Sequence, residues 1–256
     1  MRFELTLNRT AKQRMLPMDY QYYISAWIYK VLKQADRSFA GFLHEKGYGQ
    51  SETKLYKLFC FSRLNFGKPK IWKEKKLFEI PAHEIKLQIS FDVNEAAANF
   101  IKGIFMQQEF YLGDKFNGID FKVAGVQALA VPHFSETMHY RLQTPWVVSY
   151  KTENYKYPQY LSPGDENFET LAIKHIVEKY NNTRNGIPVL PGQIKLNRKS
   201  GFKRAGFVMK PGTKEQSRIV GNLFEFELAA PAEVQQMVWN AGISEKSSSG
   251  FGWCEI

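Results

Sequence analysis

One order of hydrophobic patterns occurs twice along this chain, and it restricts the possible folds more than any other feature. Alternating polar and apolar residues over Arg2–Leu7 are typical of a half-buried strand. A stripe at helical spacing through Ile24, Ile28 and Val31 predicts a helix after that strand. The remaining predicted elements of this half are strands near 57–62 and 85–91, a helix over 97–105, and strands near 110–112 and 121–130.

The second half repeats this order of elements without repeating the sequence. Its predicted elements are a strand over 140–150, a helix over 168–180, strands over 194–196 and 219–228, a helix over 231–241 and a strand over 251–256. Strand, helix, two strands, helix and strand form the ferredoxin-like (βαββαβ, RRM-like) motif. The sequence therefore predicts an α+β fold of two tandem ferredoxin-like domains with antiparallel sheets, at residues 1–131 and 139–256.

The chain has a surplus of positive charge, which indicates a polyanionic partner. Lys and Arg number 35 against 25 Asp and Glu, giving a net charge of +10. Each phosphate that such a surface neutralises releases condensed counterions. Aromatic residues make up 15% of the chain, and RNA is favoured over duplex DNA because unstacked RNA bases are often held on aromatic faces. The alternative is a basic protein with no nucleic-acid ligand.

The segment Gly242–Gly252 predicts a Gly-rich loop between the last helix and the last strand. Glycines allow backbone N–H groups to approach an anion closely, and serine hydroxyls beside a lysine add further donors. We interpret this loop as a site for RNA phosphates, and the alternative is a flexible surface hairpin. Its candidate RNA-binding residues are Gly242, Lys246, Ser247, Ser248, Ser249, Gly250 and Gly252.

A second candidate RNA surface is the segment Gly192–Arg218, which has eight cations and one acid, Glu215. On a predicted hairpin, this imbalance would form a positive ridge able to follow an RNA backbone. The alternative is an ordinary solvated face. The candidate RNA-binding residues of this segment are Lys195, Arg198, Lys199, Lys203, Arg204 and Arg218.

Three side chains in the first half can supply the chemistry of RNA cleavage. Tyr29 lies off the apolar stripe of its helix, so its phenol is expected to face outward. His44 lies on the polar flank of the next helical turn, and Lys57 opens a strand that is expected to return beside the helix. Attack by a ribose 2′-OH needs a base, an acid for the departing 5′-oxygen, and a cation for the charge on the phosphorane. The alternatives are a surface aromatic and an ordinary loop histidine.

Other chemistries lack their residue patterns in this sequence. It contains no G-x-x-x-x-G-K-[ST] loop, dinucleotide fingerprint or HExxH motif, and His175 is expected to be solvent-exposed. Cys60 and Cys254 have no metal-ligand spacing, and we interpret both as buried thiols in a reducing compartment. We therefore expect no metal and no cofactor. Since no apolar run approaches the roughly 18 residues of a membrane helix, we expect a cytoplasmic protein with no membrane contact.

These features together resemble the CRISPR-associated endoribonucleases that process repeat transcripts, which are members of the repeat-associated mysterious protein (RAMP) superfamily. The Gly-rich tail is specific for the superfamily, and the Tyr/His/Lys set is specific for its nuclease branch. The middle of the chain matches in general architecture only. The residues that carry the resemblance are Met1-Arg-Phe, Pro17, Gln21-Tyr-Tyr, Ile28-Tyr29, Leu43-His44-Glu45, Lys57-Leu-Phe, Gly242, Glu245-Lys246 and Gly250-Phe-Gly252.

The resemblance implies cleavage within each repeat of a precursor CRISPR RNA, without metal, leaving a 2′,3′-cyclic phosphate and a 5′-hydroxyl. It implies that Tyr29 and His44 share the base and acid roles, in an order that the sequence leaves open, and that Lys57 stabilises the phosphorane. Lys54 is the alternative lysine, and Lys57 is favoured because the Leu-Phe after it fits the family's strand. The family's first glycine pair is Gly-x-Gly, so Ser244 here implies a different loop shape.

The partner that the resemblance implies is CRISPR repeat RNA, taken as a single strand or a hairpin. Handover of the product to a CRISPR effector complex is a further expectation, and the chain itself would act as a monomer or homodimer. Two other functions stay open. One is a non-catalytic RAMP-fold subunit that holds CRISPR RNA in an effector complex, and the other is a general single-stranded RNA-binding protein. The Tyr/His/Lys set favours the nuclease, because binding alone does not need it.

Overall fold

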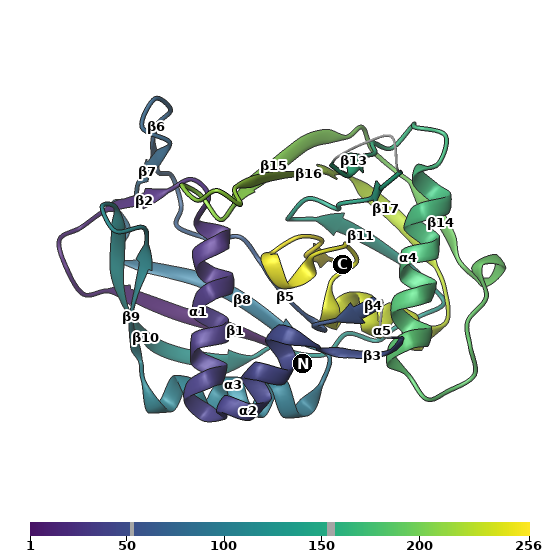
Figure 1. The fold of residues 1–256 in the computed structure, drawn as a ribbon, viewed down its shortest axis with the longest axis horizontal. Helices are drawn as coiled ribbons and strands as arrows, with labels where there is room; N and C mark the ends of the chain where they lie inside the picture. The colour runs from purple at the N-terminus through teal and green to yellow at the C-terminus, as the bar shows by residue number, and fades with distance from the viewer. Residues whose placement is uncertain (52–53, 153–156) are drawn as a thin grey trace.

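The computed structural model describes residues 1–51, 54–152 and 157–256, and it contains two larger antiparallel sheets (Figure 1). The first sheet has the order β5-β8-β1-β10-β9, and every neighbouring pair in it is antiparallel. Helices α1 (Tyr20–Ala35) and α3 (Asn94–Met106) pack on it. Its strands are β1 (Arg2–Arg9), β5 (Phe59–Phe61), β8 (Glu84–Phe91), β9 (Glu109–Gly113) and β10 (Gly118–Ala128).

The second sheet has the order β14-β17-β11-β18 and is also antiparallel. Numbered within each half of the chain, the strands of both sheets lie in the order 2-3-1-4, with the β9–β10 hairpin in the fourth place of the first sheet. The predicted α+β fold with tandem ferredoxin-like units is therefore confirmed. The second unit consists of β11 (Thr137–Leu142), α4 (Phe168–Thr183), β14 (Lys195–Arg198), β17 (Glu225–Ala229), α5 (Ala232–Ala241) and β18 (Cys254–Glu255).

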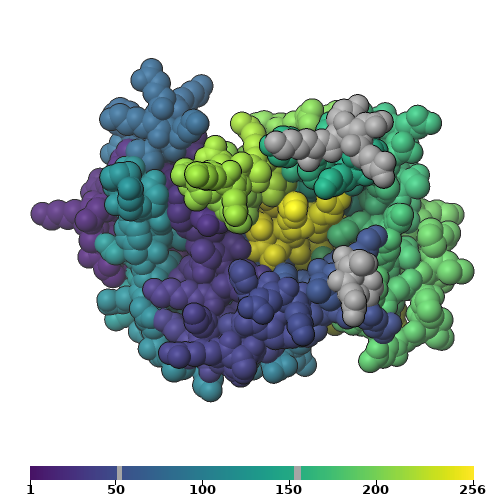
Figure 2. Space-filling view, in the orientation of Figure 1, coloured from purple at the N-terminus to yellow at the C-terminus, as the bar shows by residue number. Residues whose placement is uncertain are grey.

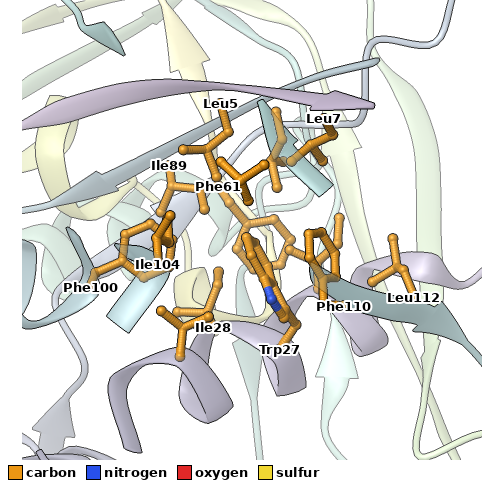
Figure 3. Packing of buried hydrophobic residues seen from close by; sticks show 14 of the residues in the cluster. Leu5, Leu7, Trp27, Ile28, Phe61, Ile89, Phe100, Ile104, Phe110 and Leu112 are labelled. Carbon is orange, nitrogen blue, oxygen red and sulfur yellow. The ribbon is translucent and has the colours of Figure 1, made fainter. Parts of the chain in front are cut away.

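The first core forms where the apolar stripe of α1 meets the inward face of the sheet (Figure 3). Trp27 and Ile28 on α1 are buried with Leu5 on β1 and Ile89 on β8. Helix α3 packs closely on α1 because Gly103 has no side chain, and a Cβ there would lie 2.1 Å from the carbonyl oxygen of Val31. Core packing therefore holds α1 rigidly, and α1 can position a site on its other face.

Shorter elements connect and extend the two sheets. Helix α2 (Arg37–Glu45) follows α1, and β2 (Met15–Pro17), β6 (Lys70–Trp72) and β7 (Leu77–Glu79) form a three-stranded sheet. Within the residues that the structure describes, three two-stranded antiparallel sheets remain, namely β3 (Tyr48–Ser51) with β4 (Lys54–Tyr56), β12 (Ser149–Tyr150) with β13 (Gln159–Tyr160), and β15 (Lys203–Met209) with β16 (Ser217–Leu223). Two 3-10 turns are η1 (Pro191–Gln193) and η2 (Ser247–Ser249).

Some predicted strands have different limits in the structure. The strand predicted from Lys57 begins at Phe59, and the unpredicted β3–β4 hairpin precedes it. The strand predicted over 219–228 is two strands, β16 and β17, in different sheets. The strand predicted over 140–150 is likewise divided into β11 and β12. Among the helices that the structure describes, none is long and apolar enough to cross a membrane.

Arg2 connects the two halves of the chain although it lies in a core strand. It is 4% exposed, and its guanidinium lies 3.2 Å from the ring centroid of Trp239 and 3.9 Å from that of Trp253. It donates hydrogen bonds to the backbone carbonyls of Trp239, at 2.6 and 3.0 Å, and of Cys254, at 2.9 Å. Burial lowers the pKa of Arg2 to about 10. This cation therefore joins β1 to the C-terminal end of the chain through cation–π and hydrogen-bond contacts.

Candidate active site

The turn between α1 and α2 brings Tyr29 and His44 together. Asp36 ends α1, and its carboxylate accepts a hydrogen bond of 2.9 Å from the backbone N–H of Phe39, which caps the start of α2. Helix α2 therefore folds back along α1. The ring centroids of Tyr29 and His44 lie 5.2 Å apart, with the ring planes at 81°. The imidazole is in the last turn of α2 and His44 is exposed.

The phenol of Tyr29 is less accessible than the sequence predicts. Tyr29 is half-buried rather than outward-facing, because its ring also packs edge-on against Phe59 with centroids 5.6 Å apart. Burial raises the pKa of Tyr29 to about 12, and a hydrogen bond with the side chain of Ser248 opposes this effect. The phenol therefore keeps its proton at neutral pH.

Lys57 reaches the same place from the loop before β5. Its Nζ donates hydrogen bonds to the carbonyl oxygens of His44, at 2.7 Å, and Lys46, at 3.1 Å, at the C-terminal end of α2. A cation is favourable at this end of a helix, while burial lowers the pKa of Lys57. Lys54, the alternative lysine, instead forms an ion pair of 2.6 Å with Glu178 on α4. The structure thus brings the rings of Tyr29 and His44 together, joins the Lys57 amine to the backbone of His44, and holds Lys54 elsewhere.

The Gly-rich loop packs directly against the catalytic candidates. The hydroxyl of Ser25 on α1 donates a hydrogen bond of 2.8 Å to the backbone carbonyl of Ser248 in η2. In Figure 2 the C-terminal residues, in yellow, lie at the base of a hollow between the N-terminal segments and the green hairpin segments. Of the loop residues, Lys246 is exposed and Ser248 and Ser249 are partly exposed.

Four of the loop residues predicted to bind RNA are buried instead, namely Gly242, Ser247, Gly250 and Gly252. Gly250 has φ +85°, and a Cβ there would lie 2.6 Å from the ring of Phe61 on β5. Gly252 has φ +75°, and its Cβ would lie 2.4 Å from Ser244. The glycines therefore serve close packing of the loop, and this is a correction to their predicted role as direct RNA contacts.

Ser244 fits the loop by forming hydrogen bonds that a glycine could not form. It is 1% exposed, and its φ is not in the left-handed region. Its hydroxyl accepts a hydrogen bond of 2.7 Å from the backbone N–H of Val147 and donates one of 2.7 Å to the carbonyl of Glu245. The Glu245 carboxylate in turn accepts hydrogen bonds from Ser149. The departure from the Gly-x-Gly pattern thus joins the loop to the segment before β12.

Lys179 is a buried residue near the site that the sequence did not identify. It is 2% exposed on α4, and its Nζ donates hydrogen bonds to the carbonyl oxygens of Ala241, at 3.0 Å, and Gly242, at 2.7 Å. These carbonyls end α5 and begin the Gly-rich loop. Burial lowers the pKa of Lys179 to about 8. The available signal was the helical spacing, because Lys179 follows Ile176 by three residues and Ala172 by seven.

The prediction that His175 is solvent-exposed is wrong, because the residue is half-buried. It lies against Tyr56, with ring centroids 6.0 Å apart, and its Nε2 is buried without a hydrogen-bond partner in the described part of the chain. Burial lowers the pKa of His175 to about 3. The β3–β4 hairpin covers this face of α4, and the sequence did not predict that hairpin.

The predicted basic ridge is divided between two sheets. Lys195, Arg198 and Lys199 belong to β14 and the residue after it, at the edge of the second sheet, whereas Lys203, Arg204 and Arg218 lie on the separate β15–β16 hairpin. Lys199 pairs with Glu227 at 3.2 Å. The other five are exposed and form no ion pair with any carboxylate that the structure describes. The hairpin cations are those nearest α1, because Val208 N–H donates a 2.8 Å hydrogen bond to Asp19.

Both cysteines are buried free thiols, as the sequence predicted. Burial raises the pKa of Cys60 to about 12 and that of Cys254 to about 11, so neither is a reactive thiolate at neutral pH. Among the described residues, no group of three or more His, Cys, Asp or Glu side chains is placed to hold a metal ion.

Comparison with known proteins assigns the fold to one family. Residues 129–256 match the family model "CRISPR associated protein Cas6, C-terminal", and residues 15–127 match "CRISPR-associated protein Cas6, N-terminal". A relative from Pyrococcus furiosus, named "putative CRISPR-associated endoribonuclease-like protein Cas6", is 26% identical over 266 residues, which covers 100% of this chain and 98% of the relative. A relative from Pyrococcus horikoshii, named "putative CRISPR-associated endoribonuclease-like protein Cas6nc", is 23% identical over 258 residues, which covers 100% of this chain and 99% of the relative.

Solved structures show the same fold along the whole chain. A Cas6-related protein from Pyrococcus furiosus superposes with a TM-score of 0.82 at 24% identity, covering 100% of this chain and 98% of the other. A structure described as a RAMP protein binding different RNA substrates gives a TM-score of 0.80 at 23% identity, with the same coverage. The family models, which together match residues 15–127 and 129–256, thus define a CRISPR-associated protein. The chain belongs to the Cas6 family.

Proposed function

We propose that this chain is an endoribonuclease that cleaves precursor CRISPR RNA within the repeat, without a metal ion, to make guide RNA. The observation that carries this proposal is the edge-to-face contact of Tyr29 and His44, with ring centroids 5.2 Å apart, beside the amine of Lys57. A phenol, an imidazole and an ammonium group can together catalyse transfer of the RNA phosphoryl group to a ribose 2′-oxygen. Membership of the Cas6 family supports a role in CRISPR RNA processing.

The proposed reaction is an internal transesterification. The 2′-oxygen of the nucleotide before the cut forms a bond to phosphorus, and the bond between phosphorus and the 5′-oxygen breaks. The base removes the proton of the 2′-hydroxyl, and the acid protonates the departing 5′-oxygen. The products are a 2′,3′-cyclic phosphate and a 5′-hydroxyl.

The environments of the two rings favour one assignment of the roles. Because burial raises the pKa of Tyr29 to about 12, the phenol carries its proton at neutral pH and suits the acid. His44 is exposed in the last turn of α2, and a neutral imidazole is the side chain that most often acts as a base near neutral pH. We therefore assign the base role to His44 and the acid role to Tyr29.

Lys57 and the Gly-rich loop would bind the phosphate at which the cut occurs. The Lys57 amine uses two of its protons on the carbonyls of His44 and Lys46, and its third proton is left for a phosphorane oxygen. Lys246 and the hydroxyls of Ser248 and Ser249 are accessible on the adjoining loop. The exposed cations of β15–β16 extend this surface for the flanking RNA.

The repeat RNA and the later fate of the product follow from the same proposal. The relative described as binding different RNA substrates supports RNA as the ligand of this fold. We place the catalytic residues in residues 1–131 and the basic hairpin with the Gly-rich loop in residues 139–256. After the cut, the guide RNA would pass to a CRISPR effector complex.

The proposal is tested with wild-type protein and the His44→Ala variant, each incubated with repeat RNA in EDTA. We expect wild type to cut at one position, the variant to bind the RNA with unchanged affinity, and its cleavage rate to fall by about 10²–10⁴-fold. A repeat with a single 2′-deoxynucleotide before the cut should bind and stay intact. Wild-type protein that binds repeat RNA tightly but never cuts it would contradict the proposal and indicate a non-catalytic binding subunit. Equal affinity for repeat and unrelated RNA would indicate a general RNA-binding protein.

A further inference from the structure

A groove of about 540 Å³ lies at the N-terminal end of α1, between β7 and the β15–β16 hairpin. Figure 1 shows both hairpins, β6–β7 and β15–β16, on the same side of the molecule at this end of α1. The groove is separate from the contact between Tyr29 and His44, which lies further along the same helix. Its lining combines aromatic, cationic and amide groups.

The aromatic wall of the groove consists of Phe66 and Phe78, backed by the buried Tyr20. The rings of Phe66 and Phe78 lie 5.6 Å apart at 47°, and Tyr20 meets Phe66 edge-on at 6.0 Å. Phe66 and Phe78 are only half-buried, so part of each ring faces the groove. Such a wall offers a surface on which an unpaired base can stack.

Three cations surround this wall, namely Arg63, Lys76 and Arg218. All three are exposed, and none forms an ion pair with a carboxylate in the part of the chain that the structure describes. The one acid in the lining, Asp19, is occupied because its Oδ1 accepts the backbone N–H of Val208 at 2.8 Å. The groove therefore has net positive charge available for the phosphates on either side of a bound base.

Gln21 is the observation that indicates a ligand. The residue is 3% exposed and lines the groove, yet its Oε1 is buried with no hydrogen-bond partner among the described residues. A buried amide oxygen without a partner costs free energy, so such atoms are rare in folded proteins. A ligand that donates a hydrogen bond here would remove that cost.

The groove and the catalytic candidates lie along one face of α1. Gln21, Ser25 and Tyr29 are four residues apart in turn, which places them in one row on a helix. Ser25 binds the carbonyl of Ser248 in the Gly-rich loop. Gln21 is roughly 12 Å from Tyr29 along the helix at 1.5 Å per residue, which corresponds to roughly two to four nucleotides of RNA.

We propose that this groove binds one unpaired nucleotide of the RNA, a few nucleotides from the cut. Its base stacks against Phe66 and Phe78 and donates its exocyclic amine to Gln21 Oε1, while Arg63, Lys76 and Arg218 bind the adjoining phosphates. Adenine and cytosine have such an amine, and uracil does not. The inference rests on the proposed function, since it makes the groove part of the same RNA-binding surface.

The test uses the full chain carrying His44→Ala, so that RNA stays intact, and labelled ten-nucleotide oligomers of A, C or U. Fluorescence anisotropy measures the dissociation constant of each. We expect Gln21→Met to raise the dissociation constants of the A and C oligomers by about tenfold and to change that of the U oligomer little. The matched control is Gln34→Met, on the same helix, whose amide binds Gln107 instead. The melting temperature of Gln21→Met should not fall, because the change removes a buried unpaired oxygen.

A Gln21→Met variant that binds all three oligomers as tightly as the parent, or loses affinity for all three equally, would overturn the groove proposal. Ultraviolet cross-linking of the bound A oligomer gives a second readout, and the modified peptide should contain Phe66 or Phe78. Both measurements report binding alone, so their failure leaves RNA cleavage untouched. A chain that shows the Gln21-dependent preference but never cuts repeat RNA would keep the groove and reject the proposed nuclease.

Discussion

Ser25 and Ser248 are 223 positions apart in sequence, and the hydroxyl of the first donates a 2.8 Å hydrogen bond to the carbonyl of the second. This bond joins the helix that carries Tyr29 to the loop that closes over it. The side chain of Ser248 also meets the phenol of Tyr29. These two polar contacts therefore add to the close packing of Gly250 against Phe61 in placing the Gly-rich loop beside the catalytic candidates.

Removing the Ser25 hydroxyl should loosen the loop without unfolding the protein. A single hydrogen bond contributes about 1 kcal/mol, so we expect Ser25→Ala to slow single-turnover RNA cleavage by about fivefold and to change the melting temperature little. Ser135→Ala, which removes a surface hydroxyl bound to the carbonyl of Thr137, is the control. Equal cleavage rates for the two variants would show that the loop is held without Ser25.

Tyr29→Phe should separate the acid from the base. The variant keeps the ring contacts with His44 and Phe59 and loses only the hydroxyl. We expect cleavage to fall by about 100-fold with unchanged RNA affinity. An RNA whose 5′-oxygen at the cut is replaced by sulfur needs no acid, because a thiolate leaves readily. That substrate should restore the rate of Tyr29→Phe but not of His44→Ala. The opposite pattern would assign the base role to Tyr29.

Lys57 and Lys54 provide a matched pair of lysines three residues apart. Lys57→Ala should lower the cleavage rate by about 10²–10³-fold, because the phosphorane loses its cation. Lys54→Ala removes only a partly exposed ion pair with Glu178, and such pairs contribute little, so cleavage should remain within about twofold of wild type. Single-turnover cleavage rates at saturating protein distinguish the two variants. A larger loss of rate for Lys54→Ala than for Lys57→Ala would assign the stabilisation of the phosphorane to Lys54.

Cations of the β15–β16 hairpin should bind the RNA backbone through charge alone. Replacing both Arg204 and Arg218 by Ala should reduce the slope of log affinity against log salt by about 1 to 2. The control replaces Lys199 and Lys210, which already pair with Glu227 and Glu215. The slope for each variant is obtained by measuring its RNA affinity at several salt concentrations. An unchanged slope for the arginine variant would remove the hairpin from the RNA-binding surface.

Lys179 should make stability depend on pH in a predictable direction. Burial lowers its pKa from 10.5 to about 8, so between these values the unfolded chain binds this proton more tightly than the folded chain. The free energy of unfolding therefore rises with pH in this window, by up to about 1.4 kcal/mol per pH unit. In Lys179→Met this contribution is absent, while the carbonyls of Ala241 and Gly242 lose their donor.

Denaturant unfolding of wild type and Lys179→Met at pH 7.5, 8.5 and 9.5 measures this effect. The difference in unfolding free energy, wild type minus variant, should grow in favour of wild type as pH rises. Lys174→Met changes an exposed lysine on the same helix and should leave the wild-type dependence unchanged. A difference that stays constant with pH would show that Lys179 retains its ordinary proton affinity in the folded chain.

The repeated order of elements was predictable because each half buries one face of its helices and strands, and burial imposes periodicity. The stripe through Ile24, Ile28 and Val31 is buried as expected, and so is the alternation at Leu5 and Leu7. Periodicity also located the β15–β16 hairpin in part. It could not divide 219–228 into two strands, since a single residue, Phe224, lies between them and they differ in the sheet to which each belongs.

Residues whose environment comes from distant segments were predicted less well. Tyr29 is half-buried by Phe59 and the Gly-rich loop, and His175 is covered by the β3–β4 hairpin, so neither burial is visible from helical spacing. Arg2 and Lys179 are charged residues in buried positions, which composition assigns to the surface. The meeting of Tyr29 with His44 was expected from family resemblance, and the structure adds the turn at Asp36 that produces it.

The candidate site is assembled from the two extremes of the chain, with the phenol at position 29 and its loop partner at position 248. During synthesis, residues 1–131 leave the ribosome before the final strand has been made. The rings of Tyr29 and His44 would then be present without the loop that covers them. A chain cut short before the Gly-rich loop would therefore lack the segment that Ser25 and Tyr29 contact, and the proposed cleavage of RNA would depend on that segment.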